Sequence, residues 1–121
     1  MLACDLDPIA SVAQQLNAEL NGVTFERTCA NLLDLHPTRT ELQVDVVLAG
    51  DVCYERESSD RITPWLRTLA AHGAHVLLAD PGRTYAPAAN VDLLATYDVP
   101  TLPELESTGH KLTKLWRLQP R

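Results

Sequence analysis

The sequence predicts an α/β fold: a Rossmann-like open sheet, mostly parallel, that closes with a C-terminal antiparallel hairpin. Strand-like and helix-like segments alternate over the first 80 residues, as in parallel sheets with helical crossovers. Two short runs rich in Val, Leu and Ala, at 44–49 and 75–79, are typical of strands buried on both faces. Two further strand patterns end the chain, which predicts a hairpin there rather than a final helix.

Composition limits the class of protein. The 121 residues are 45% hydrophobic and 21% charged, which predicts a globular chain with one domain over 1–121. A net charge of −6 disfavours a nucleic-acid binder, since phosphate contacts need a basic face. Cys4, Cys29 and Cys53 form no CxxC and are expected to be buried thiols in a reducing compartment. Without a membrane-length apolar run or a signal sequence, we expect a cytoplasmic protein.

The first strand-turn-helix unit has the clearest local signals. Residues 1–4 are apolar and precede Asp7, which is suited to cap a helix with Pro8 at its first position. Gly22 is a suitable helix end. Apolar residues recur at helical spacing between these limits and predict a core-facing side: Ile9, Val12, Ala13, Leu16 and Leu20.

The remaining elements follow from shorter patterns. A second long helix is expected to be capped by Ser58 or Ser59 and to end at Gly73, with Pro64 kinking it or delaying its start. The other expected segments, in chain order, are a strand at 23–29, a loop at 31–43, the strands at 44–49 and 75–79, a short helix near 88–94, and strands at 95–101 and 111–118 joined by a polar loop at 102–110.

Acidic residues follow three of the predicted strands. Ligands of open parallel sheets bind beyond the carboxyl ends of the strands, where Asp5, Asp7, Asp51 and Asp80 are expected. Asp7 is explained by helix capping, and Asp80 could simply start a turn. Asp51 has little turn chemistry around it and Tyr54 follows three residues later, which favours a functional role.

Three segments resemble one known family. They are residues 3–10 with 16–22, residues 45–54 with their Asp-x-x-Tyr motif, and residues 79–83 with 113–118. Together they resemble class I, seven-β-strand S-adenosylmethionine-dependent methyltransferases. Within that class they are similar to the branch of the electron transfer flavoprotein β-subunit lysine methyltransferases, whose bacterial relatives are often labelled nicotinamide N-methylase-like. The resemblance covers nearly the whole chain.

The resemblance implies S-adenosyl-L-methionine as cofactor and assigns residues to it. Asp5 matches the acid that accepts both ribose hydroxyls, and a carboxylate can take two donors at once. Leu6 would pack on the adenine. Asn31, with Leu32 beside it, matches the position that receives the adenine amino group, although an Asn in a turn is an equal alternative. Gly50 is also expected to be at the cofactor.

The resemblance also implies N-methyl transfer, with a protein lysine as the expected acceptor. The partner would be a protein such as the electron transfer flavoprotein β subunit, or a small amine. Asp51 and Tyr54 match the residues lining the acceptor pocket, and we expect Asp51 to orient the nitrogen rather than act as a strong base. Arg83 could reach an acidic partner, but a solvated loop arginine is the commoner case.

One departure from the family pattern leaves two alternatives open. The Glu/Asp-x-Gly-x-Gly loop and the strand before it have no counterpart, because none of the five glycines has that spacing. The sequence is therefore expected to lack the N-terminal strand and cofactor loop, and a catalytically inactive, truncated fragment is one alternative. The other is a phosphoacceptor receiver-like domain, which also has acids at strand ends but needs a hydroxyl residue and a Lys at later ones. The four histidines have no metal-ligand spacing, so no metal is expected.

Overall fold

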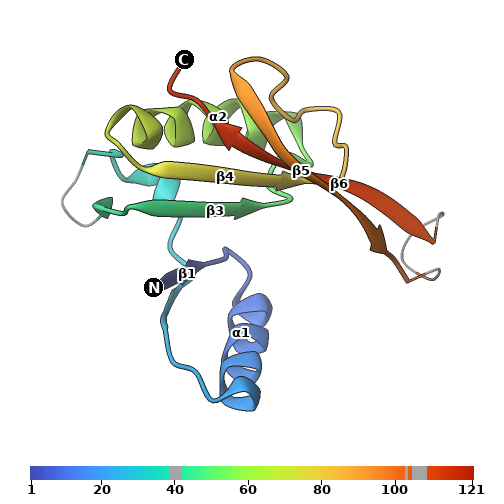
Figure 1. The fold of residues 1–121 in the computed structure, drawn as a ribbon. Coiled ribbons are helices and arrows are strands. Elements are labelled where there is room, and N and C mark those ends of the chain that lie inside the picture. The colour runs from blue at the N-terminus through green and yellow to red at the C-terminus, as the bar shows by residue number, and fades with distance from the viewer. Residues whose placement is uncertain (39–41, 103, 105–108) are drawn as a thin grey trace. The chain divides into compact units, whose positions relative to one another are not determined.

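A computed structural model describes residues 1–38, 42–102, 104 and 109–121. They form two compact units, Met1–His36 and Pro37–Arg121. The elements, labelled in Figure 1, are β1 (Leu2–Cys4), α1 (Pro8–Asn21), β2 (Glu26–Thr28), the short 3-10 helix η1 (Leu32–Asp34), β3 (Val46–Gly50), α2 (Arg56–Ala71), β4 (His75–Asp80), β5 (Val91–Pro100) and β6 (His110–Leu118). Parts of the loops predicted at 31–43 and 102–110 lie outside the described residues.

In the first unit, β1 and β2 pair in parallel and α1 connects them. The helix begins and ends where the local signals predict. The Asp7 carboxylate accepts the Ile9 N–H at 2.8 Å, and Gly22 ends the helix in the left-handed region, with φ 63°. Arg27 on β2 donates to the Gln15 side chain on α1 at 3.1 Å, so polar contacts tie the helix to the strand pair.

The apolar side of α1 does not face a core in the structure. Ile9, Val12, Leu16 and Leu20 are 76%, 55%, 60% and 83% exposed, and no residue of the helix is buried. The helical periodicity is therefore confirmed, but the burial expected for its apolar side is not found within the described residues.

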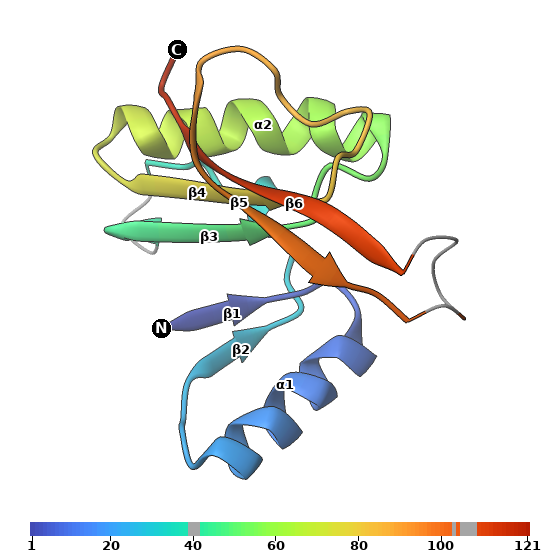
Figure 2. The same ribbon diagram turned by 45° about the vertical axis from the view of Figure 1, so that its right-hand side comes forward.

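The second unit is a four-stranded sheet in the order β3-β4-β6-β5. β3 and β4 are parallel, whereas β6 is antiparallel to both β4 and β5. The α/β sheet with parallel strands and a C-terminal antiparallel hairpin is therefore confirmed, although antiparallel pairing in this unit is more extensive than the mostly parallel sheet that the sequence predicts. Figures 1 and 2 show α2 lying along one face of this sheet. The core lies between them and consists of Ala49, Cys53, Leu66, Leu69, Val76, Leu78 and Leu118.

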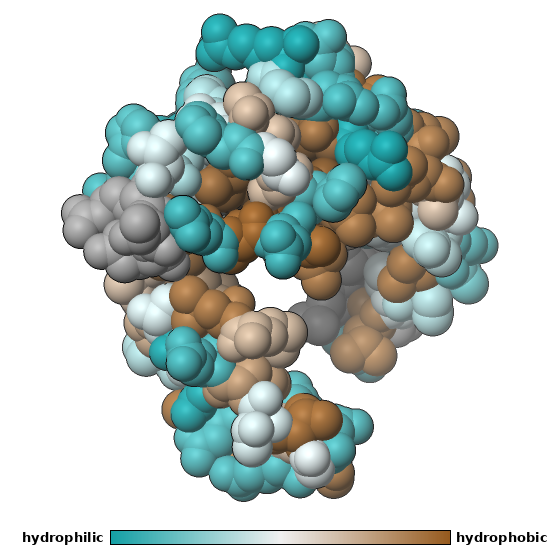
Figure 3. All heavy atoms as spheres, turned by 60° about the vertical axis from the view of Figure 1, so that its left-hand side comes forward, coloured by the Kyte–Doolittle hydropathy of each residue, from teal (hydrophilic) through white to brown (hydrophobic). Residues whose placement is uncertain are grey.

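Burial alternates along β4, whereas β3, at the end of this strand order, is largely exposed. On β4, Val76 and Leu78 are 0% and 1% exposed because they face α2. On β3, Ala49 is buried, but Val46 and Leu48 are 53% and 75% exposed. The expectation that both faces are buried is therefore wrong for the described residues, and Figure 3 shows apolar side chains at the surface.

Two predicted elements differ in the structure. The helix expected near 88–94 is absent, because β5 already begins at Val91, which pairs with Leu118 at the far end of β6. The serine cap of α2 is also wrong. The helix starts earlier, after Glu55, and Ser59 is a buried residue of its second turn that donates to the backbone oxygen of Tyr85.

The cysteines divide between the two units. Cys53 is buried, with 1% exposure, whereas Cys4 and Cys29 are exposed, so the expectation of three buried thiols is correct for Cys53 alone. Burial raises the pKa of the Cys53 thiol. Among the described residues, no helix is long and apolar enough to cross a membrane.

Candidate functional site

Four of the candidate cofactor residues follow the ends of β1 and β2, and the fifth, Gly50, is the last residue of β3. The Asp5 N–H donates to the Thr28 backbone oxygen at 3.2 Å, which joins the two strand ends. The Asp5 Oδ1 accepts the Asp7 N–H at 2.9 Å, and the side chain is exposed. Because an ionised carboxylate has about four acceptor sites, this one can still take further donors such as a pair of hydroxyls. Leu6, next in the chain, is 62% exposed.

Asn31 follows β2 and caps η1. Its side-chain Oδ1 accepts the Leu33 N–H at 3.1 Å, and its Nδ2 donates to Asp34 at 3.4 Å. The turn role that sequence left equal to a binding role is therefore present in the structure. It does not exclude the binding role, since an amide oxygen has two lone pairs. Leu32 is half-buried at the start of η1.

The candidate catalytic acid lies at the end of β3, directly after Gly50. Asp51 has φ 49°, in the left-handed region that Asp tolerates better than most residues. Its backbone N–H donates to the Ala79 oxygen on β4 at 2.9 Å, so the β3 end is fixed to the neighbouring strand. Its carboxylate is bound by Arg83 in a two-pronged ion pair, with Nε to Oδ1 and Nη2 to Oδ2 both 2.7 Å.

Asp80 builds the turn that carries this arginine. It is the last residue of β4, is 2% exposed, and its Oδ1 accepts the N–H groups of Gly82 and Arg83, both at 2.7 Å. The Gly82 φ of 93° needs a residue without a side chain. Asp80 Oδ2 is buried and has no hydrogen-bond partner within the described part of the chain. The turn-starting role expected for Asp80 is thus observed.

The segment between Asp51 and α2 alternates in burial. Cys53 packs into the core, while Asp51 and Tyr54 are exposed, Tyr54 by 57%. The Cys53 thiol has Ser59 and Thr63 of α2 as hydrogen-bond partners. The core therefore fixes the middle of the Asp-x-x-Tyr segment and leaves its two motif side chains exposed to solvent.

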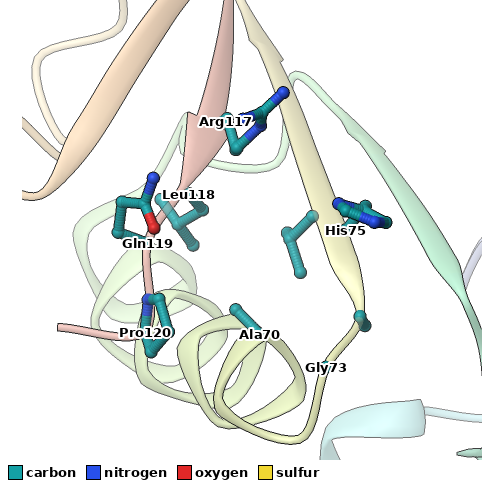
Figure 4. Close-up of a pocket in the computed structure, with 9 residues that line it drawn as sticks. Ala70, Gly73, His75, Arg117, Leu118, Gln119 and Pro120 are labelled. Atoms are coloured by element: carbon teal, nitrogen blue, oxygen red, sulfur yellow. The ribbon is translucent and has the colours of Figure 1, made fainter.

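Two hollows in the described part of the second unit lie away from Asp51. One, of about 280 Å³, lies near the amino end of β4 and is lined by Ala70, Gly73, His75 and Arg117 among others (Figure 4). Asp51 and Arg83 lie instead past the carboxyl ends of β3 and β4, the edge at which open parallel sheets bind ligands. The described residues contain no cluster of His, Cys, Asp and Glu that could hold a metal ion.

Sequence reasoning identified the acid of this site and missed its partner. Asp5 with Asn31, and Gly50 with Asp51, lie at strand ends as expected. The preference for a solvated Arg83 is wrong, because Arg83 binds Asp51. The separation of 32 residues gives no local pattern for such a pair. Both residues follow predicted strands, and the parallel pairing of those strands in the structure is what brings them together.

Comparison with proteins of known sequence gives a consistent set of relatives. No protein-family model matches the chain. It is 32% identical over 129 residues to the electron transfer flavoprotein β-subunit lysine methyltransferase of Danio rerio, covering 97% of this chain and 46% of that protein. The Rattus norvegicus and Homo sapiens proteins of the same name are 30% and 29% identical over 126 residues. The chain spans about half the length of these relatives.

Solved structures agree on the fold. A Clostridium acetobutylicum S-adenosylmethionine-dependent methyltransferase matches 98% of this chain with a TM-score of 0.55 at 11% identity, over 74% of its own length. An Escherichia coli rRNA methylase also matches 98% with a TM-score of 0.55, at 15% identity. The chain is therefore similar in fold, along nearly its whole length, to part of an S-adenosylmethionine-dependent methyltransferase, and the sequence relatives it matches are lysine methyltransferases of the electron transfer flavoprotein β subunit.

Proposed function

We propose that the chain is part of an S-adenosylmethionine-dependent N-methyltransferase that acts on a protein lysine. The main support is the homology to lysine methyltransferases over 97–99% of the chain. The named acceptor of those relatives, the electron transfer flavoprotein β subunit, is the first substrate to test. We further propose that residues 1–121 are part of one methyltransferase domain of a cytoplasmic protein. The homology favours this function over the receiver-like alternative.

The proposed cofactor residues lie in the first unit, except Gly50. When bound, S-adenosylmethionine supplies the methyl group, already activated as a sulfonium. Asp5 would accept the ribose hydroxyls, because its exposed carboxylate keeps acceptor capacity beyond its bond to Asp7. Asn31 Oδ1 would receive the adenine amino group through its second lone pair, with Leu6 and Leu32 beside the base.

The proposed acceptor residues are Asp51 and Tyr54. A lysine ammonium has no lone pair, so the amine must lose a proton before it can attack the methyl carbon; its ordinary pKa is about 10.4. Asp51 would then accept an N–H of the neutral amine, and the Tyr54 hydroxyl would help to aim the lone pair, a positioning effect. Both side chains are accessible for this task.

Methyl transfer and cofactor binding test these roles separately. With tritiated S-adenosylmethionine and purified electron transfer flavoprotein β subunit, Asp51→Asn is expected to lower transfer by about 100-fold or more. It should leave cofactor affinity, measured by calorimetry, within about twofold of wild type. Asp5→Ala should show the opposite pattern, with affinity lost first.

The matched control is Asp60→Asn, which removes an exposed carboxylate of α2 in the same unit. It should change neither measurement. These measurements are made in the full-length protein, since the 121 residues are expected to lack the cofactor loop. Unchanged turnover of Asp51→Asn would contradict the catalytic assignment, and absence of cofactor binding by the full-length wild-type protein would contradict the proposed function as a whole.

A further inference from the structure

The carboxylate proposed to orient the acceptor already has a cation bound to it. Arg83 contacts both oxygens of Asp51 at 2.7 Å, and the two side chains are 34% and 46% exposed. This pair is therefore accessible, and an acceptor amine that reaches Asp51 also reaches the guanidinium. The function proposed for Asp51 does not by itself explain why an arginine is placed there.

The arginine is held in place by the surrounding backbone. The backbone N–H of Arg83 donates to the buried Asp80 carboxylate. Gly82, between them, permits the turn because its φ is positive. The Asp51 N–H is bound to Ala79, the residue before Asp80. These contacts connect Asp51 through β4 to the backbone of Arg83, and the ion pair connects the Arg83 side chain back to Asp51. The guanidinium is therefore held next to the carboxylate.

The charge of such a pair bears on the protonation of an acceptor. A free carboxylate at this point would bind a lysine ammonium as an ion pair and so favour the protonated, unreactive form. A guanidinium bound across both oxygens cancels that attraction, and its own positive charge disfavours a second cation beside it. Arginine stays charged at any working pH, whereas the remaining lone pairs of the carboxylate still accept an N–H from a neutral amine.

We infer that Arg83 is a positioning residue which fixes the Asp51 carboxylate and makes its surroundings select the neutral form of the acceptor amine. This inference rests on the proposed function. It extends that function by assigning a residue that controls the pH range of methyl transfer, and by defining the acceptor as an amine that arrives at Asp51 already deprotonated, its proton having gone to water.

The other ionisable groups at this edge are arranged around the pair. Asp80 is buried and bound to the turn through Oδ1, and burial raises the pKa of Cys53, which keeps the thiol neutral. Tyr54 is exposed on the segment that follows Asp51. Lys114, opposite Asp80 on β6, has its ammonium 5.5 Å from the Trp116 ring. Of these groups in the described residues, Arg83 is the cation that contacts Asp51.

The test is the pH profile of methyl transfer for Arg83→Gln and Arg83→Lys in the full-length protein, beside the wild type. Removing the guanidinium should raise the pKa of the bound amine. The rising limb of kcat is then expected to move to higher pH by about 1 unit, which is about tenfold in rate below the midpoint. KM for the protein acceptor should stay level or fall, because Asp51 now attracts the ammonium.

Arg83→Lys keeps a positive charge and should return the midpoint most of the way to that of wild type, with a lower kcat because one ammonium cannot grip both oxygens. Arg56→Gln, which removes an exposed arginine of α2 paired at 3.8 Å with Asp60, should leave the profile unchanged. Circular dichroism spectra of all variants control for folding.

A merely structural role for Arg83 predicts a different result. If the arginine only shapes the loop, Arg83→Gln should raise KM and leave the pH midpoint where it is, and either finding would overturn the inference while leaving the proposed function intact. A midpoint that Arg83→Lys fails to restore would also overturn it. Absence of transfer by the full-length wild-type protein at every pH would reject the proposed function, and this inference with it.

Discussion

The two units of the molecule are built from the same kinds of element but differ in their interiors. The four-stranded unit buries a continuous set of apolar side chains between α2 and the sheet. In the unit of β1, α1 and β2, the helix has no buried residue and its apolar side chains are more than half exposed. A chain of about 36 residues rarely buries enough surface to be stable alone. A helix can therefore have all its start and end signals in the sequence without packing against a core.

The largest expected difference between the units concerns leucine truncation. Leu78→Ala should lower the free energy of unfolding by about 2–5 kcal/mol, because Leu78 is 1% exposed and fills the space between β4 and α2. Leu16→Ala, on the exposed side of α1, should cost less than about 0.5 kcal/mol. Urea unfolding followed by far-ultraviolet circular dichroism, which reports on the helices of both units, measures both. Equal losses would show that α1 is buried in solution and would contradict the difference in burial between the two units.

A smaller difference is expected at the helix starts. Asp7→Ala removes the carboxylate that accepts the Ile9 N–H and should destabilise α1 by about 1 kcal/mol. Glu55→Ala is the matched change at α2, where the capping side chain makes no hydrogen bond, and should have little effect. Amide hydrogen exchange resolves the first turn of each helix. Faster exchange in α2 than in α1 after the matched changes would contradict this assignment.

The smallest expected difference is in the thiols. Cys29 is exposed and should react first with iodoacetamide, while Cys53 should react only on unfolding. Cys4 is expected between them, because desolvation of its sulfur raises the pKa of that thiol. Mass spectrometry of peptides from a time course gives the order. Early labelling of Cys53 in the folded chain would show that the core of the second unit opens readily.

The buried thiol also predicts a pH dependence of stability. Its ordinary pKa is 9.0, and the folded value is raised by burial. Above pH 9 the unfolded chain therefore loses this proton before the folded chain does, so the free energy of unfolding falls as pH rises towards the folded pKa. Cys53→Ala should remove this part of the decline, whereas Cys29→Ala should not.

Local signals account for what the sequence could predict. Asp7, Pro8 and Gly22 fix the limits of α1 because capping is a contact between near neighbours in the chain. The sequence did not predict the start of β5. Val91 pairs with Leu118, which lies 27 residues further along the chain, and this distant pairing overrides local preference. The same reason applies to Ser59, whose hydroxyl bonds to Tyr85 rather than capping α2.

The site divides in the same way. The strand-end acids were predictable because Asp51 and Asp80 directly follow apolar runs. The two-pronged contact of Arg83 with Asp51 was not, since it depends on the parallel pairing of β3 with β4 and on a turn that Asp80 and Gly82 create. The lone pairs of Asp51 that Arg83 occupies are therefore determined by that three-dimensional arrangement.

The backbone of Asp51 has a consequence for mutational tolerance. At φ 49° a β-branched or bulky side chain is strained, whereas Asn, Asp and Gly are accommodated. A library randomised at this position and sorted for stability alone should thus return mainly these three residues. Sorting the same library for methyl transfer should then return Asp alone. The residues recovered in the first sort show what the backbone conformation permits, and the difference between the two sorts shows what the chemistry requires.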